Sequence, residues 1–340
     1  MFGNVYGLDL GTYEIKVYDK KNNSLWKEKN AIAIANEKEI FSVGDDAYTM
    51  FEKSPFHIEI QFPMKEGVIS HFYNMQYLLQ NLLKKERQFM RGSKYIVAVP
   101  TDVTEVEKRA FYDLVVHSTA KAKEVRIVER GIADAYGLDL DAQNEPAIFI
   151  ANFGAETTEL TVLSYGGVVL IKMLKIGSAT LDQAIINSVR YNQEFLIGKL
   201  TAEELRKEFG IYSEKETKSL KVAGRNLITR IPEQKEVSVG LVRAAMKEPL
   251  KACIHEIEAL LERTPPELQR TIKNNGIYIA GGLANLKGLN SYLGNALSLK
   301  VFSTENPEYC AVNGLKKIMQ SKELMKTTYS MLDDNYRWMR

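Results

Sequence analysis

The feature that most constrains the fold is a strand–turn–strand pattern that occurs twice in the chain. Residues 4–19, NVYGLDLGTYEIKVYD, form an apolar strand, a glycine-containing turn and a second strand. Residues 146–177, PAIFIANFGAETTELTVLSYGGVVLIKMLKIG, repeat this order and add a third strand. The copies lie about 145 residues apart, a domain-sized period, so the pattern predicts two similarly built halves and not a solenoid.

Strands alternate with helices between and after the two copies. Apolar periodicity predicts a helix over 72–86 and a buried strand over 94–100. Thr104 is expected to cap the next helix, with Glu107 in the capping-box position. The other expected segments are strands and turns through 51, a strand and helix over 125–140, helices over 180–196, 201–210 and 241–264, hairpins over 212–239, and a strand, glycine pair and helix over 276–297. The alternation indicates an α/β fold.

Composition narrows the class of protein. The 340 residues are 45% apolar and 26% charged, which suits a globular chain long enough for two domains. A formal charge of +2 argues against a dedicated nucleic-acid binder. Cys253 and Cys310 lack metal-ligand or redox spacing, and no apolar run reaches the length of a bilayer span. We therefore expect a cytoplasmic protein.

The two glycine turns are candidates for gripping phosphates. Backbone N–H groups in such turns, joined by the hydroxyls of Thr12, Thr157 and Thr158, can bind an anion, and Lys16 adds a positive charge. The AGGLA segment at 280–284 follows a strand and lets the backbone approach a flat ligand closely. The alternatives are two ordinary hairpins and a tight strand-to-helix turn.

A collinear series of motifs from residue 5 to about 317 resembles the MreB family of bacterial actin homologues. Its members are GLDLGT (7–12), PMKEGVISHF (63–72), VAVPTDVTEVEKRA (97–110), GAETTELTVLSYGGVV (154–169), TAEELRKEFG (201–210), GRNLITRIP (224–232), TPPEL (264–268) and GIYIAGGLANLKGL (276–289). The resemblance implies an actin-like fold of the actin and heat-shock chaperone ATPase superfamily, with two α/β lobes around a nucleotide cleft. We expect lobe I at 1–145 and 315–340, with a small subdomain at about 30–75, and lobe II at 146–314, with one at about 182–243.

The resemblance also implies ATP and Mg²⁺ as cofactors. The expected nucleotide-binding residues are Gly11, Thr12, Tyr13, Glu14 and Lys16 at the first turn, Gly154, Ala155, Glu156, Thr157 and Thr158 at the second, Glu203, Glu204, Leu205 and Arg206 beside the adenosine, and Gly281, Gly282, Leu283, Ala284 and Asn285 under the base and ribose. Asp9 and Asn152 are expected to reach the metal through water.

The chain departs from the family pattern where the chemistry is expected. Asn152 stands for a usual Asp, and Ala155 and Glu156 stand for glycines. Arg130 stands where a Glu normally positions the attacking water, and a guanidinium cannot act as a base. Glu129 is the nearest carboxylate, but one residue turns a helix by about 100°. We therefore expect ATP binding with weak or absent hydrolysis.

The family resemblance implies self-association into filaments that organise cell-wall synthesis and set cell shape at the inner face of the cell membrane. Related MreB paralogues and membrane proteins of cell-wall elongation are the implied partners. Phe89 and Met90, among basic residues, are candidates for a membrane contact. Tyr329, Tyr336 and Trp338 lie beyond the resemblance and could dock on a partner or fray. The alternatives are a regulatory pseudo-ATPase that does not polymerise and a small-molecule kinase of the same superfamily.

Overall fold

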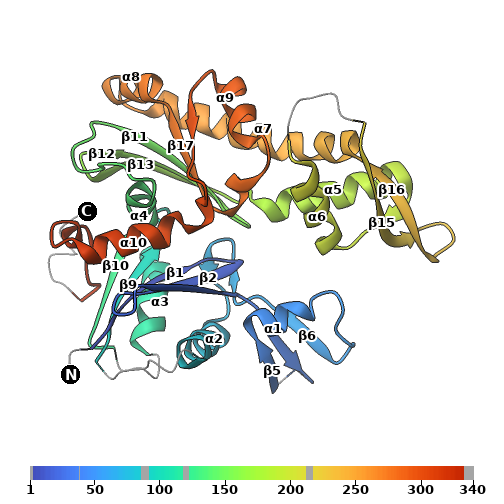
Figure 1. The fold of residues 1–340 in the computed structure, drawn as a ribbon, viewed down its shortest axis with the longest axis horizontal. Coiled ribbons are helices and arrows are strands. Elements are labelled where there is room, and N and C mark those ends of the chain that lie inside the picture. Colours follow the sequence, from blue (N-terminus) through green and yellow to red (C-terminus); the bar gives the residue numbers. More distant parts are fainter. Residues whose placement is uncertain (1–2, 38, 86–91, 118–121, 212–216, 333–340) are drawn as a thin grey trace. The chain divides into compact units, whose positions relative to one another are not determined.

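The computed structural model describes residues 3–37, 39–85, 92–117, 122–211 and 217–332. Its main elements are two five-stranded sheets of matching order (Figure 1). The first has the order β10-β9-β1-β2-β3 and comprises β1 (Val5–Leu10), β2 (Glu14–Asp19), β3 (Ser24–Lys29), β9 (Lys94–Val99) and β10 (Glu124–Glu129). The second has the order β13-β12-β11-β17-β18 and comprises β11 (Ile148–Phe153), β12 (Thr158–Ser164), β13 (Gly167–Leu174), β17 (Ile277–Ala280) and β18 (Val301–Phe302). In each sheet, three consecutive strands form a meander, and two strands from later in the chain pair beside its first strand. The two sheets therefore share one topology, which confirms the repeat expected from the sequence.

Three smaller sheets accompany the two large ones. They comprise β4 (Ile32–Ala35), β5 (Glu39–Val43) and β6 (Ile58–Gln61); β14 (Phe195–Leu196), β15 (Ser219–Asn226) and β16 (Pro232–Ser238); and β7 (Met64–Lys65) with β8 (Val68–Ile69). The hairpin of β15 and β16 confirms the hairpin expected in the polar region before the long helix.

In the part of the chain that the structure describes, the α-helices include several close to their predicted positions and three, at 44–49, 266–275 and 310–320, that were not predicted. They are α1 (Gly44–Thr49), α2 (Phe72–Lys85), α3 (Glu105–Val116), α4 (Arg130–Gly137), α5 (Ser178–Gln193), α6 (Lys199–Phe209), α7 (Val239–Arg263), α8 (Pro266–Asn275), α9 (Leu289–Leu297) and α10 (Cys310–Gln320), with short 3₁₀ turns η1 (Gly282–Asn285), η2 (Pro307–Tyr309) and η3 (Leu324–Thr327).

The local signals for helix ends are mostly confirmed. Thr104 caps α3, and the backbone N–H of Thr104 donates to the carboxylate of Glu107 at 2.7 Å, which completes the capping box. The expectation of only strands and turns before residue 51 is wrong at 44–49, which form α1. Asp45 and Asp46 lie in the first turn of α1, where negative charge is favoured by the helix dipole.

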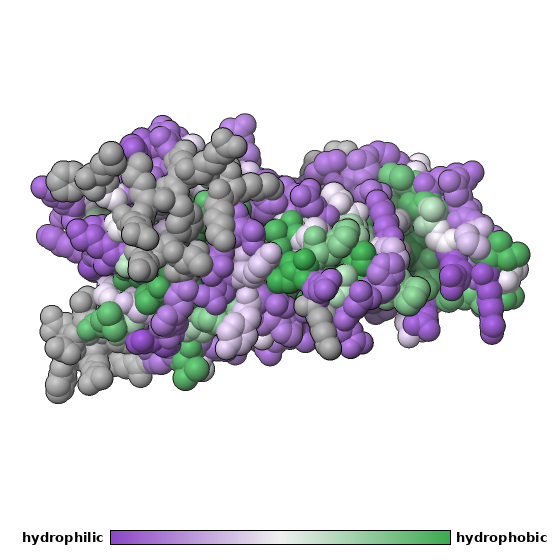
Figure 2. All heavy atoms as spheres, turned by 90° about the horizontal axis from the view of Figure 1, so that it is seen from below, coloured by the Kyte–Doolittle hydropathy of each residue, from purple (hydrophilic) through white to green (hydrophobic). Residues whose placement is uncertain are grey.

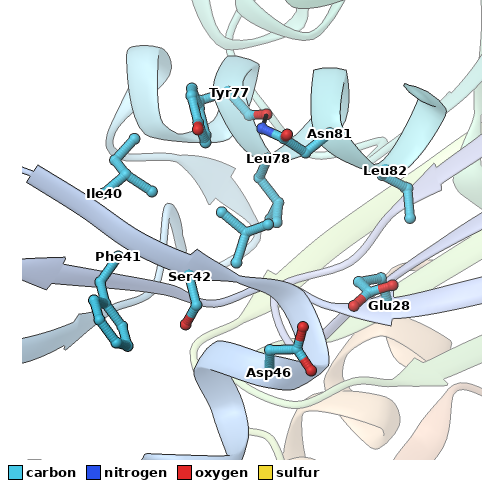
Figure 3. A pocket seen from close by; sticks show the side chains of 10 residues that line it. Glu28, Ile40, Phe41, Ser42, Asp46, Tyr77, Leu78, Asn81 and Leu82 are labelled. Carbon is cyan, nitrogen blue, oxygen red and sulfur yellow. Dashed lines mark hydrogen bonds between the residues drawn. The ribbon is translucent and has the colours of Figure 1, made fainter. Parts of the chain in front are cut away.

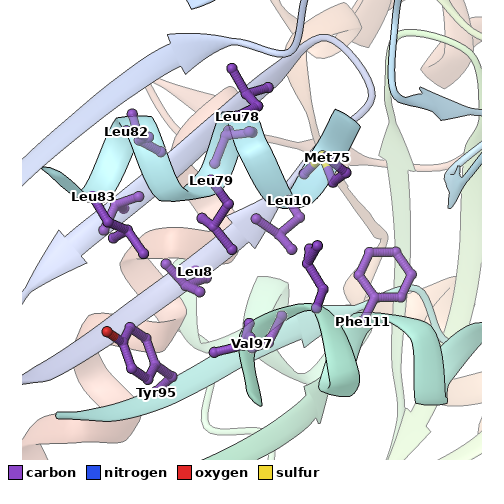
Figure 4. Packing of buried hydrophobic residues seen from close by; sticks show 14 of the residues in the cluster. Leu8, Leu10, Met75, Leu78, Leu79, Leu82, Leu83, Tyr95, Val97 and Phe111 are labelled. Carbon is purple, nitrogen blue, oxygen red and sulfur yellow. The ribbon is translucent and has the colours of Figure 1, made fainter. Parts of the chain in front are cut away.

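Side chains on the two faces of the first sheet have different surroundings. Leu8 and Leu10 of β1 face α2, where Leu79 and its neighbours pack over them (Figure 4). Gly7 lies on the opposite face, against Leu315 of α10. Because strand residues alternate between faces, Asp9 lies on the same side as Gly7. Figure 1 shows α10 on one side of this sheet and α2 with α3 on the other.

Helices α4 and α10 approach each other closely on the Gly7 face. A Cβ on Gly314 of α10 would lie 1.8 Å from the carbonyl oxygen of Ala133, and one on Gly137 would lie 2.0 Å from that of Cys310. The two backbones therefore leave no room for side chains at these glycines. This contact fixes α4, whose first residue is Arg130, relative to β1.

The chain divides into two compact units. One comprises Met1–Ile150, Thr161–Ile171 and Tyr309–Arg340, and the other comprises Ala151–Leu160 and Lys172–Glu308. The lobe and subdomain boundaries expected from the sequence remain a prediction. Among the described residues, every helix is too short or too polar to cross a bilayer.

Candidate nucleotide site

The two glycine turns have the same hydrogen-bond pattern. The N–H of Gly11, directly after β1, donates to the carbonyl oxygen of Glu14 at 3.1 Å. The N–H of Gly154, directly after β11, donates to that of Thr157 at 2.8 Å. A Cβ on either glycine would lie 2.7 Å or 2.9 Å, respectively, from the accepting oxygen, so each turn requires glycine at this position. The repeat predicted from the sequence therefore extends to the turns themselves.

The second turn is bound to the beginning of α5. The N–H groups of Ser178 and Ala179 donate to the carbonyls of Gly154 and Ala155 at 3.1 and 2.8 Å. These N–H groups have no partner within the helix, so the turn satisfies them. Gly177 permits the approach, because a Cβ there would lie 2.5 Å from the carbonyl of Ala155. The positive end of the α5 dipole thus lies behind the predicted phosphate turn.

The two threonines of the second turn, Thr157 and Thr158, are buried. Thr158 is fully buried, and its hydroxyl donates to the carbonyl of Ile176 at 2.7 Å. Thr157 is also buried. Burial raises the pKa of the neighbouring Cys253 thiol to about 11, and the hydrogen bond with Thr158 opposes this rise. The Thr158 hydroxyl therefore closes the hairpin in the structure.

The third predicted loop packs against the end of β11. Gly281 has φ of +86°, and a Cβ there would lie 2.4 Å from the side-chain oxygen of Asn152. Glycine is therefore required by conformation and by space. Gly282 is exposed, whereas the side chains of Leu283 and Ala284 are buried. Only the backbone and the exposed Asn285, whose amide donates to Glu308 at 2.7 Å, remain for contact with a ligand.

Asp9 lies between two cations. Its Oδ2 is 3.8 Å from Nζ of Lys16, and its Oδ1 is 3.9 Å from Nη2 of Arg130. Lys16 is the cross-strand partner of Asp9 in the β1–β2 register, which places both side chains on one face. Arg130 also donates to the carbonyl of Leu10 at 3.4 Å. The structure thus brings together three predicted site residues from β1, β2 and α4.

Glu14 of the first turn is surrounded by lysines. Its Oε1 accepts from Nζ of Lys29 at 2.6 Å and of Lys27 at 3.2 Å. Burial alone would raise the pKa of Glu14, but the hydrogen bond from Lys29 and the charges of Lys29, Lys16 and Lys27 together lower it. Lys27 also lies 5.8 Å from the centre of the Tyr309 ring. The aromatic residue Tyr309 was not predicted, because no local pattern connects it to the first turn.

Glu129, the alternative carboxylate for positioning water, has other partners. Its Oε1 accepts from Nζ of Lys108 and from the hydroxyl of Tyr329, each at 2.9 Å. Gly131, after Arg130, has no room for a side chain, because a Cβ would lie 2.6 Å from the Thr161 methyl group. The first turn of α4 therefore packs tightly against Thr161.

Helix α6 carries the four residues predicted beside the adenosine, and they differ in exposure. Arg206 is buried and binds Asp182 of α5 in a bidentate manner, with N–O distances of 2.6 and 3.3 Å. Burial raises the pKa of Asp182, and the bond with Arg206 opposes the rise. Leu205 is also buried. Glu203 pairs with Lys207 at 2.5 Å, and Glu204 is exposed. Glu204 is therefore accessible, Glu203 is half-buried and paired, and Arg206 has a clear structural role.

The charges around Asp9 do not match those of a divalent-cation site. Mg²⁺ prefers carboxylate oxygens, and Asn152 in the second unit is neutral where the family resemblance implies an Asp. Each oxygen of Asp9 already lies within 4 Å of a cationic side chain. Within the described ranges, no group of three or more His, Cys, Asp or Glu side chains could hold a metal ion. These residues therefore supply little of the negative charge that binds Mg²⁺.

A pocket of about 510 Å³ lies elsewhere in the first unit, between α2 and the β5–α1 segment (Figure 3). Figure 3 shows Ile40 pointing toward α2, which carries Tyr77, Leu78 and Asn81, whereas the ring of Phe41 points away from this helix. Its lining comprises Glu28, Ile40, Phe41, Ser42, Val43, Asp46, Tyr77, Leu78, Asn81 and Leu82. None of the predicted nucleotide residues lines it, so it is separate from the candidate site.

The sequence led to two predictions about the surface, a membrane contact and a docking role for the C-terminal aromatic residues. The proposed membrane residues Phe89 and Met90 lie outside the described residues, as do Tyr336 and Trp338. Tyr329 is described and forms a β-bridge with Ile127, so it packs on its own chain. Figure 2 shows hydrophobic side chains in small patches among hydrophilic ones on one face. The tip of the β15–β16 hairpin is among the exposed apolar sites, with Ile228 71% exposed.

Two solved structures are similar to this chain over almost its whole length. MreB5 of Spiroplasma citri bound to ADP matches with a TM-score of 0.88 and 25% identity, over 94% of this chain and 96% of that one. The chain of a MamK double helical filament matches with a TM-score of 0.78 and 20% identity, over 94% and 99%. The fold is therefore that of the actin-like proteins.

The sequence comparison identifies the family within this class. The MreB/Mbl protein family model matches residues 3–327, and the chain belongs to this family. The cell shape-determining protein MreB of Escherichia coli K12 is 33% identical over 329 residues, which covers 94% of each chain. The resemblance seen in the sequence motifs is confirmed, as is the predicted fold class.

Proposed function

We propose that this chain is an actin-like, ATP-binding cell shape-determining protein that assembles into filaments at the inner face of the cell membrane. The observation that carries ATP binding is the shared geometry of the two turns, each closed by a glycine N–H and each following the first strand of a meander. Backbone N–H groups of glycine-containing turns are suited to phosphate oxygens. The ADP bound to the related MreB5 supports the same ligand class.

Within this proposal, the phosphates contact residues 11–16 and 154–157, and the base and ribose contact 281–285 and the exposed side of α6. Glu204 is the exposed side chain there, Glu203 is half-buried beside Lys207, and Arg206 is held by Asp182. In this proposal Mg²⁺ binds together with the nucleotide, and Asp9 and Asn152 contact it through water. The lobe boundaries expected from the sequence belong to the same proposal.

We propose that hydrolysis is weak or absent. Arg130 occupies the position expected for the residue that positions water, and it remains protonated. Glu129 accepts from Lys108 and Tyr329 with the same oxygen, which favours a structural role for it. Loss of a positioned base typically lowers a rate by about 10²–10⁴. Phosphate release by the purified protein tests this: turnover equal to that of ordinary actin homologues would refute it.

Calorimetry with ATP tests nucleotide binding through the turns. Gly11→Ala and Gly154→Ala force a Cβ to within 2.7 and 2.9 Å of a carbonyl oxygen, so we expect each to weaken binding about tenfold or more. Gly240→Ala is the matched control, because its Cβ has no atom within 4 Å. Thermal melting checks that the variants are folded. Binding by both turn variants at the affinity of the control would refute the site.

Self-association is supported by the relatives, and the MamK chain of similar fold forms a double helical filament. Paralogues and membrane proteins of cell-wall elongation are proposed as further partners. Sedimentation and negative-stain microscopy with and without ATP test assembly. ATP binding without filaments at any protein concentration would favour the regulatory pseudo-ATPase. Transfer of the γ-phosphate to a small molecule would favour the kinase.

A further inference from the structure

The charges beside the first turn resemble those of a site for a bare polyphosphate. Asp9 and Glu14 are the carboxylates, and the cations that contact them are Lys16, Lys27, Lys29 and Arg130. The cluster therefore carries an excess of positive charge. Such an excess attracts the four negative charges of metal-free ATP and repels a divalent cation.

Arg130 is positioned for this role by the fold. It is the first residue of α4, and α4 is held by the close contact of Gly137 and Gly314 with the paired helix. Its side chain is 12% exposed and that of Asp9 is 9% exposed, so both lie largely out of water. Charges in such surroundings are screened by salt less than surface charges are. The guanidinium is therefore a fixed positive charge on the Asp9 side of the sheet.

The second unit provides the complementary observation. Asn152 adds no negative charge at the end of β11, although its side-chain oxygen packs against Gly281. The one remaining carboxylate expected to order water around a metal, Asp9, already has a cation near each oxygen. A metal ion that approached Asp9 would meet the positive charges of Arg130 and Lys16.

We infer that this chain binds metal-free ATP about as tightly as Mg-ATP, with Arg130 beside Asp9 supplying positive charge that the metal ion would otherwise bring. This inference rests on the proposed nucleotide binding and deepens it. It makes Arg130 a binding residue for the polyphosphate in addition to a replacement for the water-positioning glutamate. It also predicts that nucleotide occupancy is insensitive to the concentration of free Mg²⁺.

The test is the affinity of the full chain for ATP, measured by calorimetry in EDTA and in excess Mg²⁺ at equal ionic strength. For the unaltered chain we expect the two dissociation constants to agree within about threefold. For Arg130→Ala we expect affinity in EDTA to fall about tenfold or more, with a smaller loss in Mg²⁺. Arg130→Lys, which keeps the charge, should restore most of the binding in EDTA.

Arg109→Ala is the control, because Arg109 is 46% exposed and pairs with Asp113 on the surface of α3. It should leave both affinities unchanged. If the unaltered chain binds ATP with Mg²⁺ but loses tenfold or more in EDTA, the inference is wrong and the proposed function stands. If it binds ATP in neither condition, both fail. The measurement on the unaltered chain decides the matter even if the Arg130 variants do not fold.

Discussion

The hydroxyl of Tyr329 donates a hydrogen bond of 2.9 Å to the carboxylate of Glu129, a residue 200 positions earlier in the chain. The backbones pair as well: the N–H of Ile127 donates to the carbonyl of Tyr329 at 2.8 Å, and the N–H of Tyr329 donates back at 3.0 Å. Strand β10 is at the edge of its sheet, so this bridge covers part of an edge that would otherwise have open hydrogen-bonding groups. The C-terminal segment is thereby connected to the residue before Arg130.

Replacing Tyr329 by Phe should lower the free energy of unfolding by about 1–2 kcal/mol, because the bond joins a hydroxyl to a charged carboxylate. Urea unfolding measures the change. Tyr191→Phe is the matched control, since Tyr191 is 79% exposed and should be neutral. Equal stability of the two variants would show that the Tyr329–Glu129 bond contributes little.

Replacing Glu14 by Gln should lower stability at neutral pH by about 1 kcal/mol, because the lysine contacts of Glu14 require its charge. Burial opposes the ionised form, but the hydrogen bond from Lys29 and the nearby lysine charges lower the pKa of Glu14 overall. Its contribution is therefore complete above the unfolded-state pKa of about 4.3 and is lost as the pH falls through the lower folded-state value. The difference between the two proteins should shrink as the pH is lowered from about 5 through the folded-state pKa of Glu14. A difference that is constant over this range would contradict the assignment.

Two residues of α6 predicted to contact adenosine should respond in opposite ways to mutation. Arg206→Ala leaves the buried Asp182 without its bidentate partner and should cost about 3–5 kcal/mol of stability. Glu204→Ala changes an exposed side chain and should alter stability by less than about 0.5 kcal/mol. If Glu204 contacts the nucleotide, its variant should weaken ATP binding severalfold while melting normally. A Glu204 variant with unchanged ATP affinity would remove this residue from the proposed site.

The membrane contact is tested by the double variant Phe89→Ser, Met90→Ser. Two inserted apolar side chains contribute a few kcal/mol at most, so binding of filaments to anionic liposomes should fall strongly. Flotation measures the bound fraction. Phe56→Ser is the control, because Phe56 is fully exposed at another position. Undiminished flotation of the double variant would exclude this pair as the anchor.

Much of the fold could be predicted because it depends on local patterns. The turn glycines and the capping box at Thr104 each involve residues about three positions apart, so their signals are present in short segments. Helix α1 was missed because a six-residue helix offers too few turns for apolar periodicity to be read.

The candidate site was predictable in its backbone and less so in its side chains. Gly11, Gly154 and Gly281 are required where the sequence placed them. Arg206 matched a nucleotide-binding position, yet its partner Asp182 is a helix away, and only packing of α5 against α6 brings them together. No spacing in the sequence distinguishes an arginine that binds a ligand from one that binds a buried carboxylate.

The sequence by itself determined the duplicated α/β plan, the turns that close each meander and the membership of the MreB/Mbl family, because these depend on neighbouring residues and on motifs in order. Only the tertiary structure decided that Arg130 meets Asp9 and that Tyr329 meets Glu129. Those partners come from segments more than a hundred residues apart. The physical reason is that charges act over a few ångströms of space, and the path of the chain sets which of them become neighbours.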